Sequence, residues 1–321
     1  MRKKIIIISG DPNSVNSELI FKCWKNLKNQ TKKNIYLISN YDLLKHQFKK
    51  LNYSIKIQKV KNITDKYQSN NLKILSLKLN FDNPFNVSKK SASKFILNSL
   101  NYAHQLALNK DVKGIINCPI NKNLLKKKNS GITEFLASKC NIKSNSEVML
   151  ISNKQLSVSP ITTHIDIKDV SKKITKNLII KKIKTIDNFF KTKFKIKPKI
   201  AVLGLNPHNG EMRKNSEERK VIIPAINKLK KLRINVNGPF VSDTIFINNY
   251  KSYNVIVGMF HDQVLSPFKS IYKFDAINLT LGLKYLRVSP DHGVAKDLVG
   301  KNISNSTSML NCIKFIDKFG K

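Results

Sequence analysis

The sequence has few cysteines, few glycines and no long apolar run, and each shortage excludes a class of protein. Cys23, Cys118, Cys140 and Cys312 are its only cysteines among 321 residues, and none of them belongs to a CxxC pair. We therefore expect no disulfide framework, which suits a reducing cytosol. No uninterrupted apolar stretch approaches the roughly 20 residues that a membrane-spanning helix needs. These shortages predict a cytoplasmic globular protein without a membrane partner.

The N-terminus looks briefly like a signal peptide, because basic residues precede an apolar run. This run, Ile5 to Ile8, ends after four residues at Ser9-Gly10-Asp11-Pro12. It is too short for the apolar region of a signal peptide. Ile5 to Ile8 is instead predicted to form a first buried strand.

Acidic residues are also scarce: 59 lysines and arginines face 20 aspartates and glutamates, and the formal net charge is +39. Such a charge can indicate a nucleic-acid partner. However, the lysines are spread along the whole chain, and arginine, which base readout favours, is rare. Lysine, asparagine and isoleucine all have A/T-rich codons, so codon bias explains their abundance. We expect no specific nucleic-acid partner, some non-specific attraction to polyanions, and an electrostatic pull on phosphorylated or carboxylated substrates.

Short apolar runs alternate with amphipathic stretches, which predicts strands alternating with helices in an α/β protein with a mostly parallel sheet. The length allows one large or two medium domains. The main expected strands are residues 5–8, 34–39, 114–117, 148–152 and 156–162, and the main expected helices are residues 91–108, 133–140 and 169–190. A further helix should begin at Ser216, whose hydroxyl suits an N-cap, with Glu217 and Glu218 at its positive end. Residues 60–90 show little periodicity and predict mostly loop or a weak strand, and the lysine-rich residues 122–130 suggest a crossover between domains.

Three histidines, His164, His208 and His261, each follow an apolar run that is predicted to be a strand. The carboxyl ends of parallel strands share one edge of a sheet, where ligands bind. Three imidazoles at this edge could hold a divalent metal and leave coordination positions open for a substrate. Alternatively, each histidine only caps a strand and hydrogen-bonds locally. The acids available to orient the rings are Asp166, Asp243 and Asp262.

Longer motifs occur in a fixed order along nearly the whole chain. They include Gly10-Asp-Pro12 with Glu18, Pro119-Ile-Asn-Lys122, Gly131-Ile-Thr-Glu-Phe-Leu136, Leu205-Asn-Pro-His-Asn-Gly-Glu211, Ser242-Asp-Thr244, His261-Asp-Gln263, Asn278-Leu-Thr-Leu-Gly-Leu283 and Asp291-His-Gly293. In this order the sequence resembles the 4-hydroxythreonine-4-phosphate dehydrogenase family, NAD-dependent enzymes of pyridoxal phosphate biosynthesis. The Asn-Pro-His, His-Asp-Gln and Asp-His-Gly segments at these spacings form a specific signature.

The resemblance implies an isocitrate/isopropylmalate dehydrogenase-like fold, with two α/β/α domains, mostly parallel sheets and a cleft between the domains. The first domain would comprise residues 1–125 and 265–321 with the nucleotide-binding loop. The second, residues 126–264, would carry the metal-binding histidines and the dimer contacts. The family works as a homodimer with its active site at the subunit interface. His164, His208 and His261 would bind one divalent cation there, either zinc, magnesium or cobalt.

The resemblance also implies which residues bind a small phosphorylated hydroxy amino acid. The matching positions are Thr133, Lys269, Asn278 and Arg287. Lys269 and Arg287 can neutralise a phosphate or carboxylate, and Asn278 can orient a polar group. Two candidates for the general base stay open, Asp243 and Lys269.

The nucleotide site lacks the glycine-rich fingerprint of the Rossmann fold, because no GxGxxG follows the first strand. Residues 291–302 instead resemble the loop that surrounds the adenosine end of NAD or NADP. The predicted cofactor contacts in this loop are Asp291, His292, Gly293, Asp297 and Gly300. Glycines there allow close approach of the backbone to a ligand. The alternative is a helix entrance with an N-terminal glycine.

One departure from the family pattern concerns substrate binding. The family's Gly-His-Thr-Glu motif supplies a histidine to the substrate, and this chain has Ile132 at that position. The resemblance implies NAD-dependent oxidation of 4-phosphohydroxy-L-threonine followed by decarboxylation. Because isoleucine cannot donate a hydrogen bond, a dehydrogenase of 4-phosphothreonate or 4-phosphoerythronate is an alternative. A decayed enzyme that binds polyanions is an alternative from another class.

Overall fold

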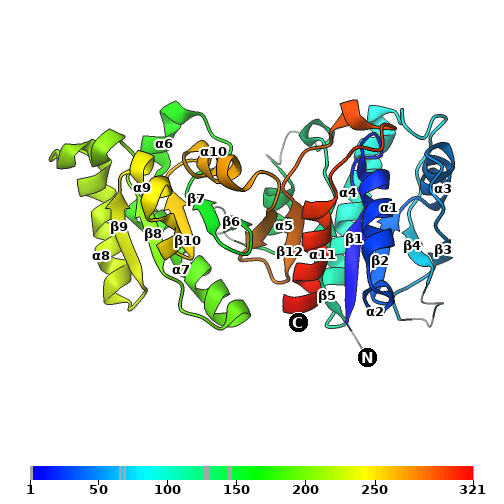
Figure 1. Ribbon diagram of the computed structural model, residues 1–321, viewed down its shortest axis with the longest axis horizontal. Coiled ribbons are helices and arrows are strands. Elements are labelled where there is room, and N and C mark those ends of the chain that lie inside the picture. Colours follow the sequence, from blue (N-terminus) through cyan, green and yellow to red (C-terminus); the bar gives the residue numbers. More distant parts are fainter. Residues whose placement is uncertain (1–2, 65–66, 68–69, 126–130, 143–146, 321) are drawn as a thin grey trace. The chain divides into compact units, whose positions relative to one another are not determined.

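The computed structural model describes residues 3–64, 67, 70–125, 131–142 and 147–320, and it divides the chain into two compact units (Figure 1). Unit 1 comprises Met1–Asn141 and Leu283–Lys321, and unit 2 comprises Ile142–Gly282. The breaks expected after residues 125 and 264 thus lie after residues 141 and 282. Residues 126–130 of the expected crossover lie outside the described part.

Two helices explain where the units divide. Helix α5 (Ile132–Lys139) belongs to unit 1 because Phe135 and Leu136 are buried in the apolar core of that unit. Helix α10 (His261–Tyr272) belongs to unit 2 because Val264 and Phe268 are buried in the other core. Apolar contacts that the sequence does not reveal therefore decide the boundaries.

In the described part of unit 1, six strands form a parallel sheet in the order β3-β4-β2-β1-β5-β12. They are β1 (Lys4–Ile8), β2 (Ile35–Ser39), β3 (Ile57–Val60), β4 (Leu72–Ser76), β5 (Val112–Asn117) and β12 (Arg287–Pro290). The helical segments besides α5 are α1 (Asn16–Asn26), α2 (Asn29–Lys32), α3 (Tyr41–Lys50), α4 (Lys89–Ala107), η1 (Lys122–Leu124), η6 (Lys296–Leu298) and α11 (Thr307–Phe319). Strand β1 confirms the first buried strand, since Ile5 to Ile8 are at most 4% exposed.

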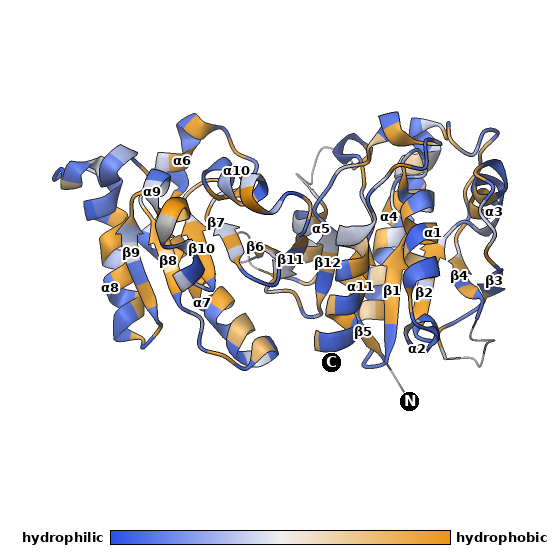
Figure 2. Ribbon diagram, viewed as in Figure 1, coloured by the Kyte–Doolittle hydropathy of each residue, from blue (hydrophilic) through white to orange (hydrophobic). Residues whose placement is uncertain are grey.

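Helices cover both faces of the unit 1 sheet. Successive strand residues point to opposite faces, so apolar side chains on both faces must be covered. Ile6 and Ile8 belong to the same apolar cluster as Phe95 and Leu100 of α4. Helices α1 and α11 lie on the opposite face (Figure 1). Figure 2 shows the same arrangement as apolar strands between helices that are apolar on one side only.

In the described part of unit 2, six strands have the order β11-β6-β7-β10-β8-β9. Strands β7, β10, β8 and β9 are parallel to one another, and β6 is antiparallel to both of its neighbours. The strands are β6 (Val148–Ser152), β7 (Ser157–Pro160), β8 (Ile200–Leu203), β9 (Val236–Phe240), β10 (Val255–Gly258) and β11 (Ile277–Leu281). The helical segments besides α10 are α6 (Ile167–Lys173), α7 (Lys176–Phe189), η2 (Phe190–Phe194), η3 (Pro207–Met212), η4 (Glu218–Ile222), α8 (Ile223–Lys231), α9 (Ser242–Asn248) and η5 (Tyr250–Ser252). The fold class is therefore α/β with mostly parallel sheets, as predicted.

Local details differ from the sequence-based expectation in two places. The single helix expected over residues 169–190 is interrupted between α6 and α7, because the Thr175 side chain caps α7 by accepting a hydrogen bond from Leu178 N at 3.2 Å. Strand β4 lies within residues 60–90, where mostly loop or a weak strand was expected, and four of its five residues are buried. Lys73 stands inside this strand, only 1% exposed, and it interrupts the apolar pattern.

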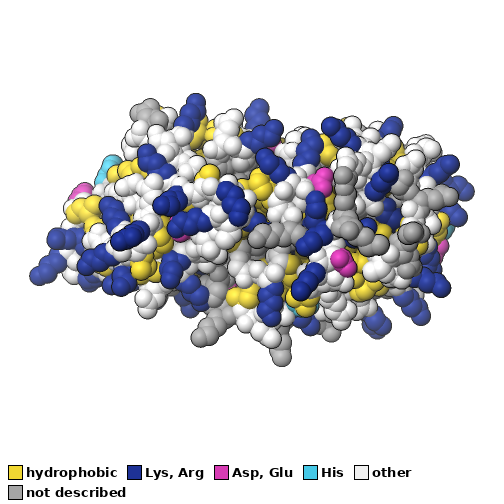
Figure 3. Space-filling view, turned by 90° about the horizontal axis from the view of Figure 1, so that it is seen from below, with side chains coloured by type: hydrophobic (Ala, Val, Ile, Leu, Met, Phe, Trp, Pro, Cys, Tyr) yellow, Lys and Arg dark blue, Asp and Glu magenta, His cyan; other side chains and the backbone are white. Residues whose placement is uncertain are grey.

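Two surface properties bear on partners. Among the residues that the structure describes, no helix is both long and apolar enough to cross a bilayer. Figure 3 shows one face, on which lysine and arginine side chains are scattered across the surface and acidic side chains are few. On this face the positive charge is therefore dispersed rather than gathered into one stripe.

Candidate active-site residues in the two units

The three histidines lie at one edge of the unit 2 sheet. Strands β7, β10 and β8 are adjacent and parallel, and each is followed by one histidine, which is His164, His261 and His208 respectively. The rings of His164 and His261 have centroids 5.9 Å apart. Among the described residues, no three His, Cys, Asp or Glu side chains converge closely enough to hold a metal ion. Within one chain the structure thus pairs His164 with His261 and leaves His208 outside this pair.

His261 is the first residue of α10, and its orientation is fixed by its neighbour. Its Nδ1 lies 2.8 Å from Asp262 Oδ1. With the proton on Nδ1, this nitrogen donates to the carboxylate and Nε2 is the nitrogen that can bind a metal. The imidazole side chain is 35% exposed, so the ring is accessible from solvent.

The backbone at the other two histidines is left-handed. His164 has φ 50° and His208 has φ 49°. The left-handed segment continues from His208 to Met212, the last residue of η3. Because a left-handed helical turn costs L-residues roughly 1–2 kcal/mol each, other contacts must hold this loop.

Glu218 provides such contacts, although the sequence suggested only a role at a helix end. Its side chain is buried, and Oε1 accepts hydrogen bonds from Leu205 N and Asn206 N, both at 2.8 Å. Its Oε2 accepts a hydrogen bond from Asn206 Nδ2 at 3.0 Å. Burial raises the pKa of Glu218, but the hydrogen bonds from Asn206 and Leu205 outweigh it and lower the pKa below its usual range. A Cβ at Gly210 would lie 2.9 Å from Glu218 Oε2 and 2.9 Å from Ser216 Cβ, so a larger residue there would displace these side chains.

Gln263 connects the ends of two strands with helix α9. Its Nε2 donates to Gly204 O at 2.7 Å, just after β8, and to Ser242 Oγ at 2.6 Å. Its Oε1 accepts from Met259 N at 2.6 Å, just after β10. The His-Asp-Gln motif thus combines a candidate ligand, its orienting acid and a residue that fixes the sheet edge.

The other predicted residues of unit 2 lie on three elements. Asp243, on α9, and Lys269, on α10, have exposed side chains. Asn278, on β11, is half-buried, and its Oδ1 is buried without a hydrogen bond from the described residues. Such an acceptor suits a ligand donor.

In unit 1, Arg287 is the centre of a buried polar cluster. It lies on β12 and is 3% exposed. Its Nε donates to Asn117 Oδ1 at 2.7 Å, and Nη1 donates to Thr133 Oγ1 at 3.4 Å. Burial lowers the pKa of Arg287 to about 10, so the guanidinium stays charged at neutral pH. Asn117 was not among the predicted site residues, although a polar residue that ends a buried strand is a signal for one.

Ile132, the residue before Thr133, has an apolar environment. It is the first residue of α5, it is partly buried, and it packs against the core cluster of unit 1. This packing favours the interpretation that the chain accommodates isoleucine at the position of the family histidine.

The predicted nucleotide loop follows β12. Asp291 is 8% exposed, and its N–H donates to Ser308 Oγ at 3.0 Å. His292 Nδ1 lies 3.1 Å from Gly293 O, and Asp297 is exposed on η6. A Cβ at Gly293 or Gly300 would meet open space, and Gly300 has φ +83°, which favours glycine. The loop can therefore bring backbone close to a ligand at both glycines.

The comparisons with known proteins identify the family of this chain. The family model described as Pyridoxal phosphate biosynthetic protein PdxA matches residues 30–316. A 4-hydroxythreonine-4-phosphate dehydrogenase from Aquifex aeolicus is 38% identical over 325 residues, covering 99% of this chain and 98% of the relative. One from Sulfurihydrogenibium sp. is 37% identical over 320 residues, covering 97% and 96%.

Solved structures give the same result. The crystal structure of a 4-hydroxythreonine-4-phosphate dehydrogenase from Klebsiella pneumoniae has a TM-score of 0.84 at 25% identity, covering 99% of this chain and all of that chain. One from Burkholderia phymatum has a TM-score of 0.81 at 28% identity, covering 100% and 99%. The chain therefore belongs to the PdxA family of pyridoxal phosphate biosynthetic proteins.

Proposed function

We propose that this chain oxidises 4-phosphohydroxy-L-threonine with NAD and then decarboxylates the product. The substrate's C3 hydroxyl loses its proton to a base, and C3 loses hydride to NAD, which is reduced to NADH. The resulting 2-amino-3-oxo acid phosphate releases its carboxylate as carbon dioxide, and the enolate that remains takes up a proton at C2 to give 3-amino-2-oxopropyl phosphate. The substrate and its oxidation follow from the name that the relatives carry, 4-hydroxythreonine-4-phosphate dehydrogenase.

The observation that carries the proposal is the position of three histidines after adjacent parallel strands. Imidazole nitrogens suit zinc or cobalt better than magnesium, which prefers oxygen ligands. The ring centroids of His164 and His261 are 5.9 Å apart, so the two imidazoles would be close enough to hold one divalent cation between them. A divalent cation held by these histidines would supply Lewis acidity, which lowers the pKa of a bound hydroxyl group.

A homodimer would complete this donor set. We propose that the metal ligands are shared between two subunits, so that His208 joins the His164–His261 pair across the interface. The exposed imidazole of His208, on a loop fixed from inside by Glu218, suits this role. The same arrangement explains why the described residues of one chain contain no group of three metal-binding side chains.

The remaining residues would bind the two organic ligands. Arg287 and Lys269 neutralise phosphate or carboxylate, and Thr133 and Asn278 orient polar substrate groups. Asp243 or Lys269 takes the hydroxyl proton. The loop that contains Asp291, His292, Gly293, Asp297 and Gly300 would hold the adenosine end of a nicotinamide cofactor, NAD or NADP, which would supply the hydride acceptor. We also expect a cytoplasmic location, because the four cysteines are free buried thiols.

A single assay separates this proposal from its alternatives. NADH formation should be fastest with 4-phosphohydroxy-L-threonine, in the presence of zinc, cobalt or magnesium. Faster turnover of 4-phosphothreonate or 4-phosphoerythronate would assign the chain to phosphorylated sugar acids instead. No turnover of any of them, together with tight nucleic-acid binding at physiological salt, would support a decayed enzyme that binds polyanions.

A further inference from the structure

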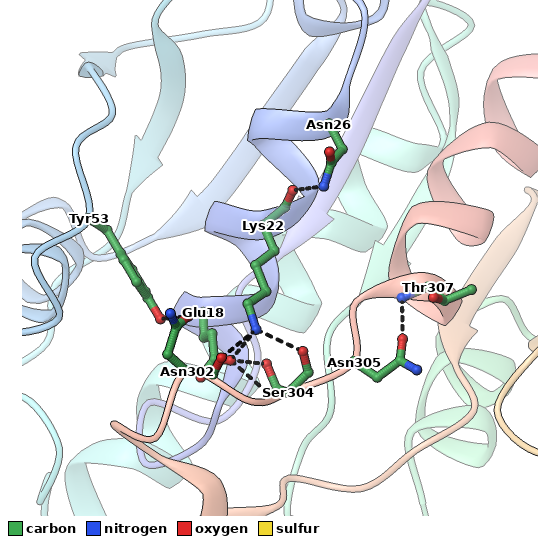
Figure 4. Close-up of polar contacts among 8 residues, drawn as sticks. All are labelled: Glu18, Lys22, Asn26, Tyr53, Asn302, Ser304, Asn305 and Thr307. Carbon is green, nitrogen blue, oxygen red and sulfur yellow. Dashed lines mark hydrogen bonds and ion pairs between the residues drawn. The ribbon is translucent and has the colours of Figure 1, made fainter.

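The predicted nucleotide loop of unit 1 is held by helix α1, which lies nearly 300 residues earlier in the sequence. Near the beginning of the loop, Val294 O accepts a hydrogen bond from Val15 N at 3.3 Å. At the end of the loop, Asn302 O and Ser304 O accept hydrogen bonds from Lys22 Nζ at 3.0 Å and 2.9 Å. Both ends of the loop are thus attached to α1 or to the residue before it, and Figure 4 shows the attachment through Lys22.

The attachment at the far end is a compact network of charged groups. Glu18 is 1% exposed, and its Oε1 accepts hydrogen bonds from Ser304 N at 2.8 Å and from Ser304 Oγ at 2.5 Å. The same oxygen accepts from Lys22 Nζ at 2.7 Å. An ammonium group has three donors, and Lys22 directs all three to Glu18 and to the two loop carbonyls. Burial of a carboxylate is costly unless such partners compensate for the lost water.

A second contact fixes the backbone of the loop at Asn302. This residue has φ 55°, a left-handed conformation, and its Oδ1 accepts a hydrogen bond from Tyr53 OH at 2.9 Å. The Tyr53 ring stacks on Phe21 of α1, with centroids 4.0 Å apart and planes 5° from parallel. The loop at Asn302 is therefore held by its main chain through Lys22 and by its side chain through Tyr53.

We propose that Glu18 and Lys22 are positioning residues for the nicotinamide cofactor, which they do not contact themselves. They hold Asn302 to Ser304 against α1, and this fixes the path of the loop that carries Asp297 and Gly300. A loop already held in its bound conformation loses less entropy when the dinucleotide binds. The inference rests on the proposed role of this loop in NAD binding, and it assigns the affinity for NAD, rather than the hydride-transfer step, to the Glu18–Lys22 pair.

Unit 2 contains a matched control pair. Asp187 and Lys191 also form an ion pair of spacing i,i+4, with 2.6 Å between Lys191 Nζ and Asp187 Oδ2. The acid is similarly buried, since its side chain is 9% exposed against 2% for Glu18. The contact between Asp187 and Lys191 spans the end of α7 and the start of η2, whereas Glu18 and Lys22 also reach the distant loop. Substitution of the control pair thus removes an ion pair without releasing the loop.

The experiment compares Glu18→Gln and Lys22→Met with Asp187→Asn and Lys191→Met. We expect the first two variants to raise the Kd and KM for NAD about tenfold, since charged hydrogen bonds to the loop are lost. Their kcat and their KM for 4-phosphohydroxy-L-threonine should stay within about twofold of wild type. Amide hydrogen exchange of residues 302–306 should be faster in both, without nucleotide. The control variants should change none of these quantities.

Each outcome decides one point. Unchanged NAD affinity in Glu18→Gln, despite faster exchange of the loop, would overturn the inference and leave the proposed function intact. An equal rise in KM for both ligands would also overturn it, because that pattern indicates general loss of structure. If wild type itself binds neither NAD nor NADP, the proposed function and the inference both fail. Lys22→Met provides a second test if Glu18→Gln does not fold. The Lys22 side chain is 25% exposed, so its replacement disturbs the interior less.

Discussion

Unit 1 and unit 2 hold their candidate site residues by different means. In unit 1, Arg287 and Asp291 are 3% and 8% exposed, and the hydrogen bonds that they donate to neighbouring elements fix their positions. In unit 2, His164 and His208 are exposed, and their left-handed backbone is the constrained feature. A buried side chain can lose one partner and keep its place, whereas an exposed ring moves with its loop. A single substitution at the candidate site should therefore reduce activity by a small factor in unit 1 and by a large factor in unit 2.

The largest effect is expected at the exposed histidines of unit 2. His208→Ala or His261→Ala should lower kcat/KM by about 10³-fold or more, because loss of a ligand removes several kcal/mol of charge stabilisation in the transition state. The free energy of unfolding of each metal-free variant should change by only about 0.5 kcal/mol, since both rings are accessible. NADH formation, bound metal and thermal unfolding test this. His46→Ala is the control, because His46 is an exposed histidine on α3 of unit 1. Wild-type activity with unchanged metal content in either variant would disprove the triad.

A smaller effect is expected when the support of the left-handed loop is removed. Glu218→Gln weakens hydrogen bonds to Leu205 N and Asn206 N, so the free energy of unfolding should fall by about 1.5–3 kcal/mol. Metal affinity should fall about 10- to 100-fold, as is usual when residues that orient metal ligands are lost. Glu211→Gln provides the control, because the Glu211 side chain is exposed and its ion pair with Arg213 is 3.7 Å long. Denaturant unfolding and metal titration measure both effects, and equal losses in the two variants would contradict a specific role for Glu218.

In unit 1 the corresponding acid should give a pH-dependent effect. Burial raises the pKa of Glu18, but hydrogen bonds from Lys22 and Ser304 outweigh it and lower the pKa in the folded state. The carboxylate therefore stabilises the fold fully above its unfolded pKa of about 4.3, and this contribution disappears as the pH falls through the folded pKa. Wild type should be about 1–2 kcal/mol more stable than Glu18→Gln at neutral pH. Urea unfolding at several pH values should show the difference shrinking in acid. A pH-independent difference would mean that shape, not charge, is what Glu18 supplies.

The sequence predicted the elements well wherever apolar residues alone decide the structure. Ile5 to Ile8 and Val148 to Ser152 form strands as expected, and the histidines do follow adjacent strands. Strand β4 was harder to predict because Lys73 is buried in it, with its Nζ 3.2 Å from Lys32 O and 5.2 Å from the centre of the Tyr36 ring. That environment depends on tertiary contacts, which periodicity does not reveal.

The structural roles of the two buried acids, Glu218 and Glu18, could not be predicted from the sequence either. Glu218 next to a predicted helix start suggested a favourable helix dipole, but its carboxylate accepts hydrogen bonds from a loop twelve and more residues earlier. Glu18 interacts with Ser304, which is 286 residues away. No local rule connects residues at such separations. The positive φ of His164 and His208 is also a property of the folded loops, since histidine has no local preference strong enough to require it.

The smallest effect is expected at Ile132, where unit 1 departs from the family pattern. Ile132→His restores a hydrogen-bond donor beside Thr133, which already lies 3.4 Å from Arg287 Nη1. A regained hydrogen bond to a charged substrate group contributes roughly 1.5–3 kcal/mol, but insertion of an imidazole into an apolar contact offsets part of it. We therefore expect kcat/KM for 4-phosphohydroxy-L-threonine to rise by up to about tenfold, with a small loss of stability. Ile132→Val is the control, because it changes volume without adding a donor. Steady-state kinetics of both variants decide the matter: an unchanged or lower kcat/KM in Ile132→His, with stability preserved, would show that unit 1 has repacked around isoleucine and that the substrate does not use this position.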